Sequence, residues 1–199
     1  MNNQNQIQWP TTEQLRAELE RVRYRRKYMS VLRSTIYTLI ALATVVLLAV
    51  LWLPVFRITG DSMAETLNND DIVVAWRSEE PERGEMIAFT SENNKTLVKR
   101  VVAVGGDTVN IRTYGSVLVN GVLLDEPYLT GKAFGECDIE FPLDVPEGTV
   151  FVLGDNRDES VDSRSSVMGC VPVEQITGRM LMRVWPIQDF EWYISFEQL

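Results

Sequence analysis

A lysine and a serine are the two residues of this chain whose surroundings suit catalysis. Lys99 lies in the middle of the mostly apolar segment 96–104, which the pattern predicts to be a β-strand. Alternation along a strand places Lys99 on the same face as Leu97 and Val101. If that face is buried, desolvation lowers the pKa of the ammonium from about 10.4 toward neutrality, and the amine becomes a general base. A lone lysine in such a strand more often lies at a solvated sheet edge, so other residues must support this interpretation.

Ser62 is the candidate nucleophile. It follows Gly60 and Asp61 in a predicted turn, shortly after an apolar N-terminal segment. The chain has no histidine, which excludes a Ser-His-Asp triad, a Cys-His dyad and a histidine-based zinc site. A neutral Lys99 amine within hydrogen-bond reach could instead take the Ser62 proton during attack on a carbonyl and return it to the leaving amine. Backbone N–H groups of the turn that contains Gly60 could hold the oxyanion.

A polar loop that ends at Arg164 is expected to support this pair. In it, Ser160 would orient Lys99, and Asp162 would pair with Arg164 or with Arg100. The alternatives are a solvated charged turn and a calcium-binding loop. Because the acidic residues lack the regular spacing of an EF-hand, we predict no metal and no cofactor.

The part of the chain that must position these residues is predicted to be all-β, built from short antiparallel strands. Alternating or apolar segments of strand length are bounded by turn residues, and few segments beyond the N-terminal region have a helical pattern. Residues 108–148 are interpreted as a smaller β-subdomain inserted into the main sheet, with an Asn120-Gly121 hairpin turn of type I′. Strands are predicted at residues 72–76, 86–90, 96–104, 108–112, 117–124, 149–153, 171–173 and 176–184, with a short one starting at residue 56.

A membrane span is predicted near the N-terminus. Residues 36–53 are eighteen residues without a charge, which as a helix span about 27 Å, close to the thickness of a bilayer core. A cleaved signal peptide fits less well, because the apolar run exceeds the usual length of roughly 7 to 15 residues and no small-residue cleavage site follows it.

The distribution of charge predicts the orientation of that span. Residues 1–33 hold seven Lys and Arg against three Asp and Glu, whereas residues 56–199 hold twelve against twenty-five. By the positive-inside rule, we expect a basic, partly helical cytoplasmic segment (1–33), a transmembrane anchor (34–55) and an extracytoplasmic domain (56–199). The acidic domain argues against nucleic-acid binding. Cys137 and Cys170 could form one disulfide outside the cytoplasm, and the sequence leaves this open.

Three sequence boxes resemble those of the bacterial type I signal peptidases, or leader peptidases, which are serine proteases with a Ser-Lys dyad. The resemblance covers residues 34–184. The boxes are Gly60-Asp61-Ser62-Met63 followed by Thr66-Leu67, then Lys99-Arg100-Val101-Val102 running to Gly106-Asp107, then Gly154-Asp155-Asn156-Arg157 through Ser160, Asp162, Ser163 and Arg164.

The resemblance implies both an activity and a set of roles. It implies cleavage of signal peptides from exported preproteins after small residues at positions −1 and −3, with Ser62 as nucleophile and Lys99 as general base. Ser160 would hydrogen-bond Lys99, and Asp162 and Arg164 would buttress the site. The partners would be signal-peptide-bearing preproteins and the lipid bilayer. Shallow apolar pockets for the substrate would be lined by Phe56, Ile58, Met63, Leu67, Leu97 and Val98.

The chain departs from the family pattern at a few positions. Glu65 stands where the family usually has proline, Asp70 where it has glycine, and Gly60 lacks the hydroxyl that some relatives use for the oxyanion. Ala103 and Gly105 replace a usual glycine and proline. Three alternatives are a catalytically idle relative that assists surface assembly, a dedicated processing peptidase, and a self-cleaving DNA-damage switch. The last would require a helix-turn-helix in place of the apolar segment, and none is visible.

Overall fold

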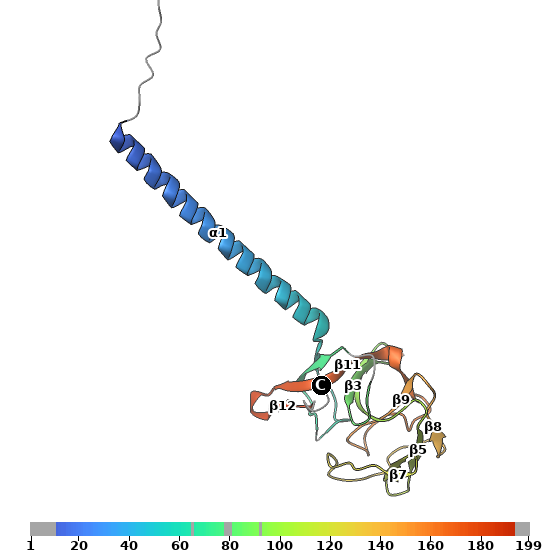
Figure 1. Ribbon diagram of the computed structural model, residues 1–199. Helices are drawn as coiled ribbons and strands as arrows, with labels where there is room; N and C mark the ends of the chain where they lie inside the picture. Colours follow the sequence, from blue (N-terminus) through green and yellow to red (C-terminus); the bar gives the residue numbers. More distant parts are fainter. Residues whose placement is uncertain (1–10, 65, 78–80, 92, 194–199) are drawn as a thin grey trace, which may run out of the picture. The chain divides into compact units, whose positions relative to one another are not determined.

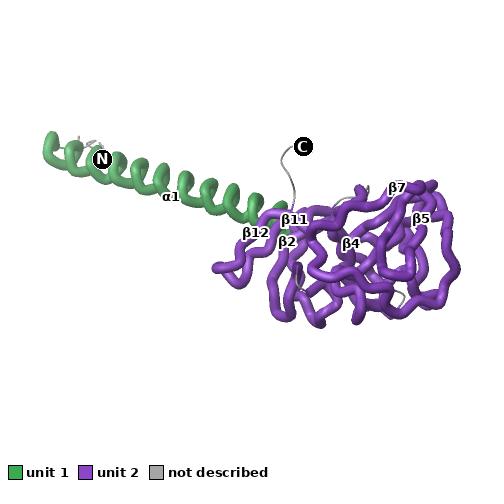
Figure 2. Tube along the Cα trace, turned by 90° about the horizontal axis from the view of Figure 1, so that it is seen from below, with its two compact units in different colours: residues 1–50 green, residues 51–199 purple. Residues whose placement is uncertain are grey.

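The computed structural model describes residues 11–64, 66–77, 81–91 and 93–193 of the chain. Glu65 therefore lies outside the described residues. The chain forms two compact units, residues 1–50 and residues 51–199, which are coloured separately in Figure 2.

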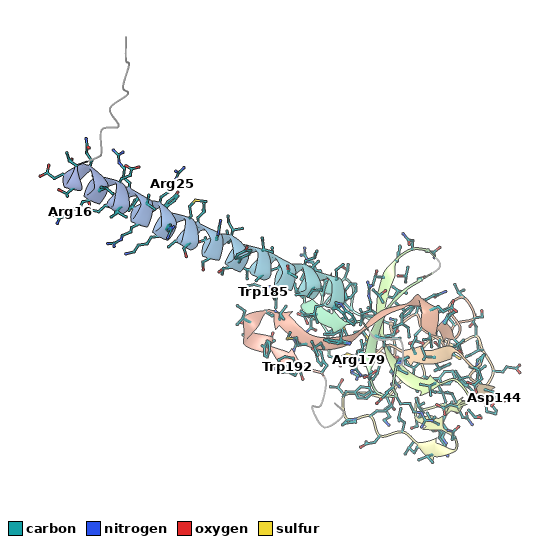
Figure 3. All side chains as sticks on the ribbon, turned by 45° about the horizontal axis from the view of Figure 1, so that its top comes forward. Arg16, Arg25, Asp144, Arg179, Trp185 and Trp192 are labelled. Atoms are coloured by element: carbon teal, nitrogen blue, oxygen red, sulfur yellow. The ribbon has the colours of Figure 1, made fainter. Side chains whose placement is uncertain are left out.

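The first unit is built on one helix, α1 (Thr12–Trp52), whose last two residues belong to the second unit. Its start is a capping box, because the Gln14 N–H donates to the Thr11 hydroxyl and the Thr11 N–H donates to the Gln14 side chain. The helix is long and apolar enough to cross a membrane. Residues 12–33 of the predicted basic segment and residues 34–52 of the predicted anchor thus form one continuous helix, and Arg16 and Arg25 mark its basic portion in Figure 3.

Three threonine hydroxyls lie within or beside the apolar part of α1. Each donates to the backbone carbonyl four residues earlier at 2.9–3.0 Å, so that none is left without an acceptor in an apolar environment. The three are Thr35, Thr38 and Thr44.

Most strands of the second unit form one antiparallel sheet (Figure 1). The strand order is β1-β2-β11-β3-β4-β9-β10, and β12 pairs with β11 outside this path. The predicted all-β class is confirmed, and short 3₁₀ helices lie at Val173–Gln175 and Ile187–Asp189. The strands are β1 (Val55–Arg57), β2 (Ile72–Trp76), β3 (Met86–Thr90), β4 (Thr96–Val104), β9 (Thr149–Leu153), β10 (Val171–Pro172), β11 (Ile176–Trp185) and β12 (Glu191–Trp192).

Residues from the predicted insertion form a second sheet. Its order is β7 (Val122–Leu123), β6 (Val117–Val119), β5 (Thr108–Ile111) and β8 (Leu143–Asp144). Asn120 and Gly121 both have positive φ, as a type I′ turn requires. The second sheet shares one hydrophobic core with the first, since Val109 and Val117 pack in the same cluster as Phe151 of β9. The domain limits drawn from the sequence stay a prediction.

Strand β4 runs through the centre of the main sheet and separates the apolar clusters. Val101 packs with Ile87 and Phe89, and Leu97 packs against the same cluster. Val98 packs against a different cluster. The alternation predicted from the sequence is therefore present, and Lys99 lies on the buried face that carries Leu97 and Val101.

Candidate active site

Lys99 is held inside the protein without an ion-pair partner among the described residues. Its exposed fraction is 3%, and its Nζ donates to Ser160 Oγ at 3.0 Å. Burial lowers the pKa of Lys99 from 10.5 to about 8. The charges of Asp162 and Asp155 oppose this shift, and that of Arg164 reinforces it. The Lys99 amine is therefore mostly protonated at neutral pH and loses its proton as the pH rises through about 8.

The sheet register explains why Ser160 reaches Lys99. Strand β9 pairs with β4 so that Leu153 lies opposite Arg100, the residue next to Lys99. The chain leaves β9 after Leu153, and the loop that follows therefore passes beside Lys99. Ser160, which is 4% exposed, comes from that loop.

Ser62 lies in a turn that the same loop clamps. The Asn156 N–H donates to the Ser62 carbonyl at 3.2 Å, and the Asn156 side-chain amide donates to the Asp61 carbonyl at 3.1 Å. Ser62 is half-buried and shares with Lys99 a cleft of about 570 Å³. Among the described residues, no hydrogen bond joins the Ser62 hydroxyl to the Lys99 amine. Catalytic hydrogen bonds often form only when substrate is bound.

One backbone N–H of the turn that contains Ser62 is not available to bind an oxyanion. Gly60 has φ +94°, and its N–H is already used, because it donates to Asn69 Oδ1 at 3.0 Å. This N–H is therefore not free to bind an oxyanion, and the expectation that N–H groups of the turn hold the oxyanion stays a prediction. Within the described part of the chain the Ser62 N–H has no hydrogen-bond partner, so it is available as a donor of this turn.

Gly154 lies between the Ser160 side chain and the backbone of Ser62. A Cβ at this position would overlap Ser160 Oγ and would lie 2.5 Å from the Ser62 carbonyl oxygen. Both of its peptide groups are held, since its N–H donates to Asp162 Oδ2 at 3.0 Å and its carbonyl accepts from Arg157 Nε at 3.0 Å. Only a residue without a side chain fits in this contact.

Two buried ion pairs brace the loop. Arg164 donates from Nε and Nη2 to Asp162, each at 2.8 Å. The sequence leaves Arg164 and Arg100 open as partners of Asp162, and the structure has Arg164. Arg100 instead pairs with Asp155 at 2.6 and 2.9 Å. The Thr66 hydroxyl also donates to Asp155 at 2.6 Å, which ties the loop to the segment after Ser62.

The predicted pocket residues divide into two groups. Leu97 lines the cleft beside the dyad. The other five belong to a core cluster on the far side of β4 or pack against it, and their part in substrate binding stays a prediction. They are Ile58 (6% exposed), Met63 (2%), Leu67 (0%), and the half-buried Phe56 and Val98.

Much of the cleft wall could not be found from the sequence. Phe89, Val161, Met168 and Val171 line it. Nothing in the strand patterns around Phe89 and Val171 distinguishes these two from core residues, whereas Val161 is an isolated apolar residue in a polar loop. Cys170 also lines the cleft, and both cysteines are free thiols. No group of three or more Cys, Asp or Glu side chains in the described ranges is arranged to hold a metal ion.

Comparison with known proteins places the chain in a family. A profile described as "Signal peptidase, peptidase S26" matches residues 31–185. The chain belongs to the S26 signal peptidase family. The resemblance inferred from the three sequence boxes is thereby confirmed.

Several relatives of this signal peptidase family are similar over the same region. A probable signal peptidase I-2 of Synechocystis sp. is 36% identical over 141 residues, which are 65% of this chain and 62% of that protein. Signal peptidase IB of Staphylococcus aureus (strain MRSA252) is 33% identical over 71% of this chain and 83% of its own length. Signal peptidase I of Mycobacterium tuberculosis is 38% identical over 50% of this chain and 40% of its own length. A crystal structure of a signal peptidase I from Enterococcus faecalis V583 is 34% identical, with a TM-score of 0.43, and covers 50% of this chain and 96% of that one.

One departure from the S26 family pattern has a visible structural consequence. Asp70, where the family usually has glycine, adopts φ +73°, a left-handed conformation that glycine takes without strain. Aspartate tolerates this region better than most residues. Its carboxylate also accepts two hydrogen bonds from Arg57, although both side chains are largely exposed and the pair contributes little to stability.

Proposed function

We propose that this chain is a membrane-anchored serine endopeptidase that cleaves signal peptides from exported preproteins after small residues at −1 and −3. Ser62 is the nucleophile and Lys99 the general base. The observation that carries the proposal is the buried Lys99 amine, which has a hydroxyl rather than a carboxylate as its hydrogen-bond partner and opens onto the same cleft as Ser62.

In the proposed mechanism, the neutral Lys99 amine accepts the proton of the Ser62 hydroxyl as Oγ attacks the scissile carbonyl carbon. The Ser62 N–H donates to the oxyanion of the tetrahedral intermediate. The Lys99 ammonium then gives its proton to the departing amine, and the acyl-enzyme remains. Water, deprotonated by the same amine, hydrolyses the ester and regenerates Ser62.

Each supporting residue has a positioning task in this scheme. Ser160 fixes the amine through the 3.0 Å hydrogen bond. The pair Asp162–Arg164 holds the loop that carries Ser160. Gly60 turns the chain with its positive φ, so that Ser62 is presented to the cleft.

The proposed substrate binds as an extended chain along the sheet edge beside the cleft, with main-chain pairing for affinity and small pockets for selectivity. Leu97 is the predicted pocket residue that already borders this space. The buried side chains of Ile58 and Met63 do not line this cleft, and in the proposal they border separate shallow pockets for the small residues at −1 and −3.

The proposed anchor is the apolar part of α1, with the N-terminus in the cytoplasm and the peptidase unit outside. Exposed tryptophan side chains of this unit support a position close to the membrane surface. Trp52 and Trp76 are exposed and their rings are 6.1 Å apart. Trp185 ends β11 and Trp192 ends the paired strand β12. Both are labelled in Figure 3, and each is about half exposed. Tryptophan is enriched where membrane meets water.

The proposal is tested by incubating the full chain, purified in detergent, with a preprotein whose signal peptide ends in Ala-x-Ala. We expect cleavage directly after the second alanine, because small pockets above a packed core leave no room for larger side chains. A matched preprotein with leucine at −1 is expected to be cut at least about 100-fold more slowly. Mass spectrometry of the products locates the cut. Absence of cleavage would favour an idle relative that assists assembly, and equal rates on both preproteins would contradict the specificity.

A further inference from the structure

The loop that carries Ser160 is contacted by a segment to which the proposed mechanism assigns no role. This segment is residues 126–135, which lie in the connection between β7 and β8. Its most buried charged side chain is Glu126, whose carboxylate is fully enclosed and pairs with Arg157 Nη2 at 2.5 Å. The partly exposed Lys132 lies with its Nζ 3.3 Å from Oε2 of the same carboxylate.

Arg157 connects Glu126 to the segments that carry the candidate catalytic residues. Its side chain is 2% exposed, so without Glu126 it would be a buried cation paired only with backbone oxygen. Its Nε donates to the Gly154 carbonyl. Gly154 in turn touches Ser160 Oγ and the Ser62 carbonyl so closely that no side chain fits. One chain of contacts therefore runs from Glu126 to the hydroxyl that holds the Lys99 amine.

Two further contacts join the same segment to the loop. The Tyr128 ring lies under the guanidinium of Arg100, 3.9 Å from ring centroid to Cζ, and Arg100 pairs with Asp155. The Phe134 carbonyl accepts a hydrogen bond from Arg164 at 2.5 Å. Segment 126–135 thus contacts Arg157 and Arg164 of the loop directly and reaches Asp155 through Arg100 of β4. Glu126 supplies the only carboxylate that the segment contributes to these contacts.

We propose that Glu126 is a positioning residue for the dyad: it neutralises Arg157, so that Arg157 can hold Gly154 against Ser160 and Ser62. This inference rests on the proposed peptidase function, and it assigns a catalytic purpose to segment 126–135. Glu126 itself does not line the cleft and touches no substrate.

The kinetic test compares Glu126→Gln, Arg157→Met and the double variant in the full chain. Loss of Glu126 leaves a buried cation and loosens Gly154, and a displacement of about 1 Å at the dyad costs roughly 100-fold in rate. We expect kcat to fall about 10- to 100-fold in Glu126→Gln while KM stays within twofold, because the cleft is untouched. Asp125→Asn, an exposed neighbouring carboxylate, is the matched control and should behave as wild type.

The double variant separates an effect of Glu126 on the position of the dyad from an effect on the stability of the fold. Removing both buried charges should restore most of the melting temperature lost in Glu126→Gln, since no unpaired charge remains. The Gly154 carbonyl still lacks its donor, so kcat should stay low. Recovery of kcat together with the melting temperature would overturn the proposal, because Glu126 would then act only on stability.

A second readout does not depend on activity. The chain has four lysines, so ¹³Cε-lysine labelling gives few signals, and Lys99→Met identifies that of Lys99. The charged groups nearest the Lys99 amine are Asp162, Arg164 and Asp155, and none is altered in Glu126→Gln. Loosening of Ser160 lets water reach the amine, so the Lys99 midpoint should rise from about 8 toward 10.5. A purely electrostatic effect of the freed Arg157 charge would lower it, and either a lower or an unchanged midpoint would overturn the proposal. If wild type cleaves no preprotein but the midpoint rises, the proposed function fails and the positioning role stands.

Discussion

Replacement of Lys99 by methionine is expected to abolish preprotein cleavage and, at the same time, to stabilise the fold at pH 7. The activity should fall by at least about 10³-fold, because the substitution removes the proposed general base. A lysine whose pKa is lowered from 10.5 to about 8 and whose exposed fraction is 3% costs the folded state about 3 kcal/mol at pH 7. Methionine keeps the volume and removes that cost.

The sign of the pH dependence makes this prediction specific. Between pH 8 and 10.5 the unfolded wild type binds more protons than the folded one, so its free energy of unfolding rises with pH through this window. The stability advantage of Lys99→Met should therefore be largest at pH 7 and shrink as pH approaches 10.5. Chemical denaturation at several pH values measures it. Ser62→Ala should be equally inactive with a free energy of unfolding within about 0.5 kcal/mol of wild type. Cleavage by Lys99→Met within about tenfold of the wild-type rate would remove Lys99 from the mechanism.

Replacement of Gly154 by alanine is expected to reduce kcat by about 100-fold or more, although residue 154 takes no chemical part in the reaction. The added Cβ would overlap Ser160 Oγ and would lie 2.5 Å from the Ser62 carbonyl oxygen, so at least one of the two must move. Displacement of either residue misaligns the dyad, and a shift of about 1 Å is enough for such a loss. Overpacking should also lower the free energy of unfolding by about 1 to 3 kcal/mol.

Gly131→Ala is the matched control for this substitution. A methyl group added at Gly131 would enter open space, and this glycine has no positive φ, so alanine should leave kcat unchanged. Gly154 also lacks a positive φ, which means that its effect would come from the close contact and not from backbone strain. Wild-type kcat in Gly154→Ala would show that the loop adapts and that this contact does not position the dyad.

The strands could be predicted because their signals are local. Residues 72–76, 86–90, 96–104 and 149–153 were expected as strands and are β2, β3, β4 and β9 with the same limits. Alternation and turn residues determine such segments. The order of strands could not be predicted in this way, since β11 lies between β2 and β3 through pairings distant in sequence.

The residues of the candidate site likewise divide into those with a local sequence signal and those without one. Lys99 and Ser62 stand out locally, one as a charge in an apolar strand and the other in a glycine turn. The partners of other groups depend on contacts across the fold: Asn69 takes the Gly60 N–H, and Glu126 meets Arg157 from a segment that has no regular pattern. Long-range contacts between single polar side chains leave no periodic signal in one sequence.

The pH dependence of kcat/KM on the Ala-x-Ala preprotein is the sharpest test of whether the Lys99 amine is the base. Only the neutral amine can accept a proton, so with a pKa of about 8 the active fraction should rise from about one tenth at pH 7 to about nine tenths at pH 9. We expect an acidic limb with its midpoint near pH 8. A profile that is flat from pH 6 to 9 would rule out an amine base.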